Sequence, residues 1–530
     1  MHNNLDSHFN RRRYCVVGEG CTHSRSNLAS AAEASPSDAI TSNDNSTAPF
    51  KFGRLFDQAK GLTDEERAQK VSLLVRLGQE MNKEILPLPE DSNIPSGYTY
   101  LGQFIAHEVT FDKTTNLQAI ESDPQSWRSP QLDLDSLYGN IEDSNDREAL
   151  YDKQNSGRLK VGVTHPQPRL NKVFDCDLPR DNAGKALVGD PRNDENIAIA
   201  QMHLAFIKFH NKVVESLEKA NVAKELIFDR AREKVVNSFH SIILNDFLPR
   251  LLDERILEEV RASRAQLFVD KTASDLFMPL EFSAAAFRFG HSMVRSSYQW
   301  NAYHSDEISV PARLRQLMDQ TEFSGSIGKP GGNLAIDSDW IIDWRRFFDF
   351  SSLGYPAPKS DSNKAGKIDR VFSLHLEKLP GFPHNGLAEN LQPIMVRNLL
   401  RGFALDLPSG ETVASKVPGA IPLQPDQLAG DSEEIKELLN SPLLKGQTPL
   451  YYYILREAEL NGGEKLGEVG SYIVAQTLIG LMQASKHSSF NSALSDFRMV
   501  DLLHQADVVD PIGRHLDSIY APQVLHASHP

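Results

Sequence analysis

The segment Gly102-Gln103-Phe104-Ile105-Ala106-His107 carries two polar side chains within an apolar run. Gln103 and His107 are four residues apart, so a helix would project both onto one face. Histidine is the side chain best suited to exchange protons near neutral pH. The pattern predicts a buried acid–base site, although a single histidine on an apolar helix is more often a hydrogen-bonded core residue.

Zinc is a weaker interpretation of the same region. His107-Glu108-Val109-Thr110-Phe111 resembles the first half of a zinc HExxH motif, but Phe111 occupies the position of the second histidine. The cysteines offer no other zinc site, because Cys15, Cys21 and Cys176 form no CxxC pair and cannot make a disulfide framework.

A second polar segment begins at Asp190-Pro191-Arg192, which has the composition of a helix start. We expect one helix to run from there to about Val214, with Arg192 and Glu195 on one face of its first turn. An arginine at a helix N-terminus is unfavourable for the helix dipole. This position favours a role other than helix stability, with a surface ion pair between Arg192 and Glu195 as the alternative.

Two further segments could hold a flat ligand. His291 ends the run Phe287-Arg288-Phe289-Gly290-His291, which we expect to lie in a helix. Gly290 would let a flat ligand approach the backbone, and Arg288 could meet a carboxylate. Asn398 could accept a hydrogen bond from a histidine ring, as a metal-bound histidine usually requires. Taken alone, the segment ending at His291 fits an ordinary core helix equally well, and a lone Asn398 is more often a structural amide.

Long helical patterns would position these side chains. We expect an amphipathic helix near Asp64 to Asn82, a helix from about Phe228 to Leu252, and another through Val469 to Leu481. Little strand alternation is visible, which predicts one mainly α-helical catalytic domain over residues 51–516. Residues 1–50 are rich in Ser, Asn, Asp and Ala and predict a disordered or weakly ordered tail, and residues 517–530 form a C-terminal tail.

Composition excludes several classes of function. The formal net charge is −15, which argues against a nucleic-acid surface or an anionic-membrane partner. No apolar run is long enough for a membrane span, and the segment after Arg11-Arg12-Arg13 is too short for a signal-peptide core. We expect a monomer without nucleic acid or a membrane span, cytoplasmic or secreted without a leader.

In this order, the four segments resemble the animal haem peroxidase (peroxidase–cyclooxygenase) superfamily, especially its bacterial-type members related to myeloperoxidase and peroxinectin. The resemblance covers roughly Phe52 to Ser485. It implies a large single-domain helical fold with haem b between the central helices. It also implies hydrogen peroxide as a substrate, together with a small-molecule or halide electron donor.

The resemblance assigns roles to individual residues. His107 would be the distal histidine, Gln103 its polar neighbour and Arg192 the distal arginine. His291 would be the haem-iron ligand, with Asn398 holding its ring. The cofactor-binding set implied by the resemblance is His291, Asn398, Arg288, Glu195 and Arg401, with Arg288 as a propionate partner.

Departures from the family pattern bear on how the haem is held. Many mammalian members form an ester from an aspartate at the position of Ala106, so that ester is impossible here. Glu195 matches the second ester carboxylate, which predicts haem that is either non-covalent or singly ester-linked. Asn196 replaces the methionine that makes a sulfonium link in myeloperoxidase. The resemblance therefore implies a milder oxidant, suited to bromide, iodide, thiocyanate or phenols.

The loop from Ser129 to Gly139 is similar to the calcium-binding loop of the family, and it alternates oxygen-bearing side chains as a hard cation requires. An Asx-rich turn is the alternative. Glu108 takes the place of the family's usual aspartate. The implied calcium ligands are Ser129, Gln131 (through its main-chain carbonyl), Asp133, Asp135 and Glu108.

The sequence thus predicts a haem peroxidase that reduces hydrogen peroxide and oxidises small donors through a ferryl intermediate. A fatty-acid dioxygenase of the same superfamily is an alternative, but it needs a radical-forming tyrosine where this chain has Arg288. A haem-containing adhesion protein is a weaker alternative, because no RGD triplet is present. A haem-free scaffold is disfavoured because His107, Arg192, His291 and Asn398 occur together.

Overall fold

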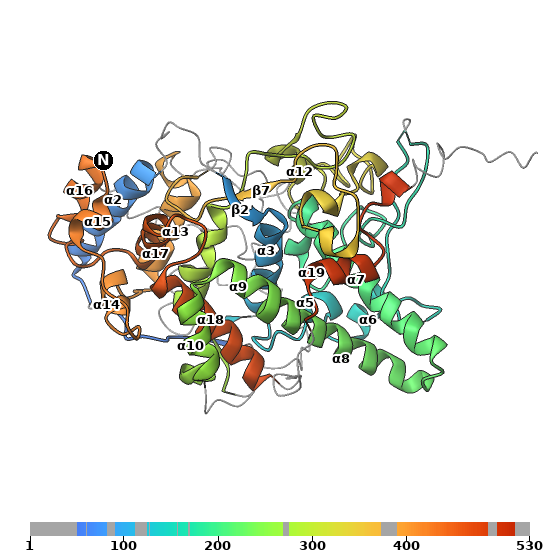
Figure 1. The fold of residues 1–530 in the computed structure, drawn as a ribbon, viewed down its shortest axis with the longest axis horizontal. Helices are drawn as coiled ribbons and strands as arrows, with labels where there is room; N and C mark the ends of the chain where they lie inside the picture. Colours follow the sequence, from blue (N-terminus) through green and yellow to red (C-terminus); the bar gives the residue numbers. More distant parts are fainter. Residues whose placement is uncertain are drawn as a thin grey trace, which may run out of the picture.

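The computed structural model describes residues 50–59, 61–81, 91–111, 125–126, 128–155, 157–167, 170–268, 275–372, 389–485 and 496–514. The described chain is mainly helical (Figure 1). Its α-helices are α2 (Asp64–Met81), α3 (Gly97–Val109), α5 (Asp135–Tyr138), α6 (Ser144–Leu150), α7 (Ile197–Lys219), α8 (Lys224–Ile242), α9 (Leu248–Leu251), α10 (Glu254–Ala262), α11 (Leu280–Ala284), α12 (Leu314–Asp319), α13 (Ile394–Ala404), α14 (Gly410–Ala414), α15 (Pro425–Ala429), α16 (Glu433–Leu439), α17 (Leu450–Leu460), α18 (Glu468–Ala484) and α19 (Met499–Gln505).

The strands are short, with two to five residues each. They are β1 (Phe50–Gly53), β2 (Asp91–Pro95), β3 (Gln125–Ser126), β4 (Phe277–Pro279), β5 (Ser297–Tyr298), β6 (Ala312–Arg313) and β7 (Lys364–Gly366). Strand β1 pairs with β3 antiparallel and with β4 in parallel, while β2 pairs with β7 and β5 with β6, both antiparallel. The many helices and few short strands confirm the predicted mainly α fold.

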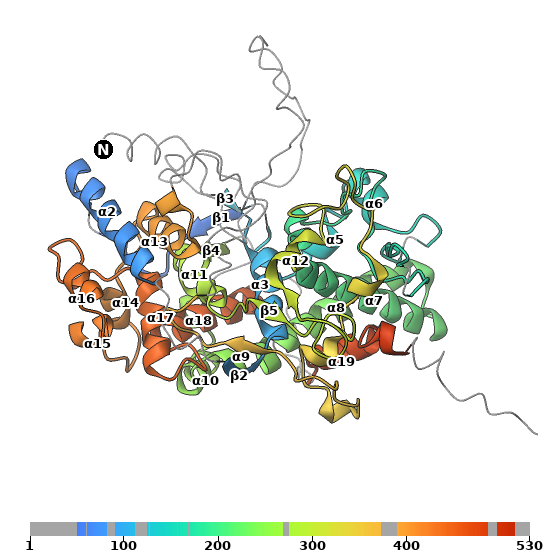
Figure 2. The same ribbon diagram turned by 90° about the horizontal axis from the view of Figure 1, so that it is seen from above.

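Helix α3 lies at the centre of the molecule, between α7, α8 and α19 on one side and α2, α13 and α17 on the other (Figures 1 and 2). Aromatic packing fixes it there. Phe104 of α3 stacks on Phe206 of α7 with ring centroids 4.6 Å apart, and it meets Phe239 of α8 edge-on at 5.9 Å. Such pairs add about 0.5–1.5 kcal/mol each beyond their buried area.

The predicted helix from Asp190 to Val214 is two elements instead of one. Asp190 caps a 3₁₀ turn, Pro191–Asp194, by accepting a hydrogen bond from the backbone N–H of Arg192. Asn196 then adopts an extended conformation and caps α7 by accepting from the N–H of Ile199. The prediction of one continuous helix was wrong because a second capping residue lies six positions after the first.

The predicted helix from Phe228 to Leu252 is also interrupted. Helix α8 ends at Ile242, a π-helical turn covers Ile243–Phe247, and α9 follows. Pro249 stands in the first turn of α9 and has no N–H to donate, so a regular α ladder cannot pass through it. The helices predicted near Asp64–Asn82 and Val469–Leu481 correspond to α2 and α18.

Both predicted tails lie outside the described residues, apart from Phe50, and so do Cys15 and Cys21. The domain boundaries therefore remain predictions. Among the described residues, no helix combines the length and the hydropathy that crossing a membrane requires.

Candidate active site

His107 lies near the end of α3 and is completely buried. Its Nδ1 is 2.9 Å from Oδ1 of Asn193, an amide oxygen that can only accept, so Nδ1 carries the proton. Nε2 has no hydrogen-bond partner in the described part of the chain and presents a lone pair. Burial, followed by the nearby Arg192 charge, lowers the pKa of His107 to about 3. The imidazole is therefore a neutral base with a fixed tautomer.

Asn193 is the residue that sequence reasoning missed. It stands in the 3₁₀ turn and is fully buried. Its oxygen accepts from His107, while its Nδ2 lies 2.9 Å from Nδ1 of His203 in α7 and donates to it. The only available sequence signal was its position between Arg192 and Glu195, since an asparagine there fits a turn equally well.

Gln103 and Glu195 complete the surroundings of His107. Gln103 donates from Nε2 to Oε2 of Glu195 at 3.2 Å, and its Oε1 accepts from Nδ2 of Asn196 at 3.2 Å. The same Oε2 of Glu195 is 3.7 Å from Nε2 of His107. Burial raises the pKa of Glu195 to about 7. The structure thus brings the predicted Gln103, His107 and Glu195 together on one side of α3.

Arg192 lies behind His107. Its Nη2 donates to the backbone carbonyls of His107 (2.9 Å) and Thr110 (2.5 Å), and its side chain pairs with Asp190 at 2.7 Å. Its guanidinium also stands 4.6 Å from the ring centre of Phe111. Although burial opposes ionisation, the charges of Arg192 and Arg128 hold the pKa of Asp190 well below its usual range. Arg192 therefore ties the 3₁₀ turn to the end of α3, and it is absent from the described lining of the cavity below.

His291 ends a 3₁₀ helix, Ala286–His291, so the predicted regular helix is a tighter one here. Its Nδ1 lies 3.0 Å from Nδ2 of Asn398, a residue of α13. The Oδ1 of Asn398 accepts from Nη1 of Arg288 at 2.9 Å, and Nε of Arg288 donates to the carbonyl of Ser283 at 2.9 Å. The predicted proximal residues are thus in contact, but the expected direction of the hydrogen bond was wrong. Asn398 turns its amide N–H toward His291, because its oxygen accepts from Arg288. Arg401 is buried one turn after Asn398 on α13 and is absent from the described cavity lining.

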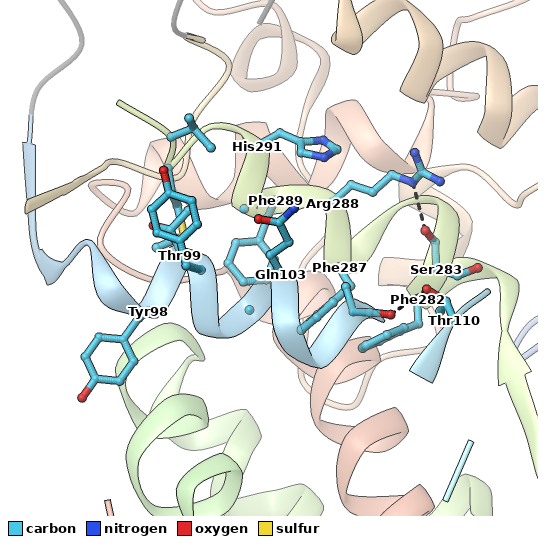
Figure 3. Close-up of a pocket in the computed structure, with 16 residues that line it drawn as sticks. Tyr98, Thr99, Gln103, Thr110, Phe282, Ser283, Phe287, Arg288, Phe289 and His291 are labelled. Carbon is cyan, nitrogen blue, oxygen red and sulfur yellow. Dashed lines mark hydrogen bonds between the residues drawn. The ribbon is translucent and has the colours of Figure 1, made fainter. Parts of the chain in front are cut away.

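A cavity separates α3 from the 3₁₀ helix that carries His291 (Figure 3). Its volume, counted together with the part that is open to solvent, is about 810 Å³. Gln103 and Ala106 line one wall, and Phe287, Phe289 and His291 line the other. The full described lining is Tyr98, Thr99, Tyr100, Gly102, Gln103, Ala106, Thr110, Phe282, Ser283, Phe287, Arg288, Phe289, Gly290, His291, Met293 and Val294.

The lining fits a flat, largely apolar cofactor with one histidine ligand. A Cβ placed on Gly290 would meet no protein atom within 4 Å, so the backbone beside His291 is open to a ligand. The aromatic rings would cover the faces of such a group, and the His291 ring lies at the cavity wall (Figure 3). These features match the way a histidine holds haem iron.

A carboxylate cluster lies directly behind His107. Oxygen atoms of Glu108, Asp133 and Asp135 all lie within 4.8 Å of one another. Leu132 and Leu134 have φ of 53° and 59°, and these left-handed turns bring the alternate aspartates to the same side. Burial and the neighbouring carboxylates raise the pKa of Glu108. The Oδ1 atoms of Asp133 and Asp135 are buried without a hydrogen bond, which fits a hard cation.

The other two predicted calcium ligands lie in the same loop. The N–H of Ser129 donates to Oδ2 of Asp135 at 3.0 Å, and its hydroxyl accepts from the N–H of Gln131 at 3.2 Å. Glu108 also accepts from the N–H groups of Asp135 and Ser136, both at 3.1 Å. The loop is therefore anchored to α3 by the residue next to His107.

Comparison with known proteins gives consistent matches. Residues 110–329 match the family model described as animal haem peroxidase. A "Peroxidase-like protein" of Margaritifera margaritifera is 34% identical over 183 residues, which are 32% of this chain and 22% of that protein. "Heme peroxidase 2" of Caenorhabditis elegans is 25% identical over 456 residues, covering 73% of this chain and 58% of that protein. The chain thus spans less than two thirds of the length of either relative.

Solved structures share the fold. Peroxidase A from Dictyostelium discoideum superimposes with a TM-score of 0.56 at 16% identity, covering 87% of this chain and 91% of that one. The fatty acid alpha-dioxygenase of Oryza sativa superimposes with a TM-score of 0.54 at 13% identity, covering 89% of this chain and 81% of that one. At these identities the likeness extends to the fold alone.

Proposed function

Because the chain belongs to the animal haem peroxidase superfamily, we propose that it is a haem peroxidase that reduces hydrogen peroxide and oxidises small electron donors. The observation that carries this proposal is a cavity with His291 in one wall and, in the other, the helix α3 that carries the buried His107. His291 lines one wall, while His107 stands on α3 beside Gln103 and Ala106, which line the other.

Haem, when bound, would supply the redox chemistry, and the protein would hold it and move protons. His291 would be its ligand, and Asn398 would orient the ring. On the opposite side, the lone pair on Nε2 of His107 would take a proton from peroxide and return it to the departing oxygen. The Asn193 contact keeps that nitrogen unprotonated. Arg192 would stabilise negative charge as the O–O bond breaks, after turning from the carbonyls that it contacts here.

The donors proposed are bromide, iodide, thiocyanate and phenols. Ala106 cannot form an ester and Asn196 cannot form a sulfonium link, which leaves Glu195 as the one proposed covalent anchor. Fewer electron-withdrawing bonds would make a milder oxidant. We expect turnover with bromide and little with chloride, measured as peroxide-dependent halogenation. Chloride turnover at a rate comparable to bromide would contradict this donor range.

The proposal is tested first by haem binding. Protein supplied with haem should show a Soret band, and its absence would contradict the proposed function. Acid–acetone extraction then distinguishes the two linkage states. Haem retained on the protein would indicate the Glu195 ester, and complete extraction would indicate non-covalent haem.

A fatty-acid dioxygenase is the second candidate, favoured by the fold shared with the Oryza sativa enzyme. Arg288 argues against it, because an arginine cannot form the tyrosyl radical that this chemistry needs at that position. Its side chain instead donates hydrogen bonds to Asn398 and to the backbone carbonyl of Ser283. Oxygen uptake with palmitic acid, measured beside peroxide-dependent iodide oxidation, separates the two candidates.

A further inference from the structure

A row of aromatic rings leads away from the cavity toward the surface. It starts at Tyr100, which lines the cavity and is 3% exposed. The Tyr100 ring lies 5.8 Å, centroid to centroid, from that of Tyr298. Tyr298 stacks on Phe347 at 5.7 Å, and Phe347 in turn meets Trp300 edge-on at 5.4 Å. Tyr298 and Trp300 are thus joined through a ring that packs against both.

The row continues to the surface through Trp340. The indole Nε1 of Trp300 donates to the backbone carbonyl of Trp340 at 2.9 Å. The Trp340 ring stacks on His304 with centroids 3.9 Å apart. Trp340 is 7% exposed and the His304 side chain 22% exposed. The nearly buried outer end of the row therefore meets solvent mainly through the stacked His304, whereas its inner end reaches the cavity.

Tyrosine and tryptophan are the side chains that lose a single electron most readily, and closely packed rings exchange electrons quickly. We propose that this row carries single electrons from the surface to the cavity, which gives the protein a second oxidation site, at Trp340, for donors too large to enter. The row consists of Tyr100, Tyr298, Trp300 and Trp340.

The inference rests on the proposed function, because hydrogen peroxide reduced in the cavity is the oxidant. Tyr100 gives one electron and its phenolic proton to the oxygen that is being reduced to water there. Tyr298 restores Tyr100 by the same transfer, and Trp300 and Trp340 then pass the electron onward in turn. The outside donor supplies the last electron, and water supplies the proton that Tyr298 regains after passing its own to Tyr100. Two such passages convert one peroxide to two waters.

The chain offers a matched control for the exit. Trp344 packs against Phe347 at 6.1 Å and so belongs to the same aromatic cluster, but it is only 1% exposed. It would therefore be a branch without an outlet. Trp340→Phe and Trp344→Phe each replace one indole by a smaller ring, and they differ in that only Trp340 stacks on the partly exposed His304.

The test compares a bulky and a small donor in haem-loaded protein. Ferrous cytochrome c is too large for the cavity and its positive charge suits a chain of net charge −15, while iodide can enter. In Trp340→Phe we expect cytochrome c oxidation to fall by about tenfold and iodide oxidation to stay within about twofold of wild type. Trp344→Phe should leave both rates near wild type. Rapid-freeze EPR after peroxide addition should show an organic radical with a tryptophan component in wild type that Trp340→Phe loses.

Three outcomes would contradict the electron route. Unchanged cytochrome c oxidation in Trp340→Phe, or an equal fall in Trp344→Phe, would overturn the route while leaving the proposed function intact. If wild-type protein oxidises neither donor with peroxide, the proposed function fails and the route fails with it.

Discussion

The two sides of the cavity hold their histidines in opposite ways, because His291 lines one wall while His107 is buried in the helix α3 that forms the other. His107 is completely buried, and its tautomer is fixed by Asn193. His291 ends a short 3₁₀ helix beside Gly290, where a side chain would meet open space, and it is partly exposed. The difference separates two tasks. A general base needs a fixed tautomer with one nitrogen ready to accept a proton, whereas a metal ligand needs a nitrogen that a cofactor can reach.

The largest expected effect comes from removing each of the two histidines in turn. His291→Ala should lose haem binding, seen as loss of the Soret band in haem-supplemented protein. His107→Ala should keep haem but react with peroxide about 10²–10⁴-fold more slowly in stopped-flow absorbance, the usual contribution of general acid–base catalysis. Equal haem retention in both variants would contradict the assignment of haem binding to His291 and of proton transfer to His107.

Removing the group that fixes the distal tautomer should have a smaller effect. Asn193→Ala would let the Nδ1 of His107 lose its hydrogen bond, and both tautomers would then be populated. We expect the peroxide reaction to slow by about 10–100-fold, as for other residues that orient a functional histidine. Haem binding should stay intact. The matched proximal variant, Asn398→Ala, should instead weaken haem retention. Haem loss in Asn193→Ala, with intact haem and a slower peroxide reaction in Asn398→Ala, would contradict the different tasks of the two histidines.

Glu195 makes the distal wall sensitive to pH. Burial raises its pKa from 4.5 to about 7, so the folded protein binds a proton more tightly than the unfolded chain. The stability this contributes is complete below about pH 4.5, declines as pH rises, and is lost above about pH 7. The difference in the free energy of unfolding between wild type and Glu195→Gln should change by about 3 kcal/mol between pH 4 and pH 8. Urea unfolding of both proteins without bound haem measures it, and parallel pH profiles would contradict the shift.

The smallest expected effect concerns the carboxylate cluster behind His107. If Glu108, Asp133 and Asp135 bind calcium, adding the ion at about 100 times its Kd should stabilise the fold by about 2.7 kcal/mol. Asp133→Asn should weaken this stabilisation, measured as the calcium-dependent rise in Tm. Magnesium is the control, because it demands a smaller and more regular site. An equal response to both cations would argue against a built calcium site.

Local patterns predicted the helices well where one signal dominated. The helices near Asp64 and Val469 are present as α2 and α18. The prediction failed at Asp190, where Asn196 provides a second cap, and near Phe228–Leu252, where Pro249 interrupts the ladder. In both cases the apolar spacing continued across the break. Burial on one face therefore did not reveal where the backbone hydrogen bonds change pattern.

By itself, the sequence determined the mainly helical class and the neighbouring side chains of one helix, such as Gln103 with His107. Their spacing along one short segment suffices, because helical geometry is local. Only the tertiary structure decided which nitrogen of His107 carries a proton, that Asn398 faces His291 across 107 residues of chain, and that Arg192 turns toward backbone carbonyls. Those contacts depend on how α3, α7 and α13 pack, and packing is set by the whole core.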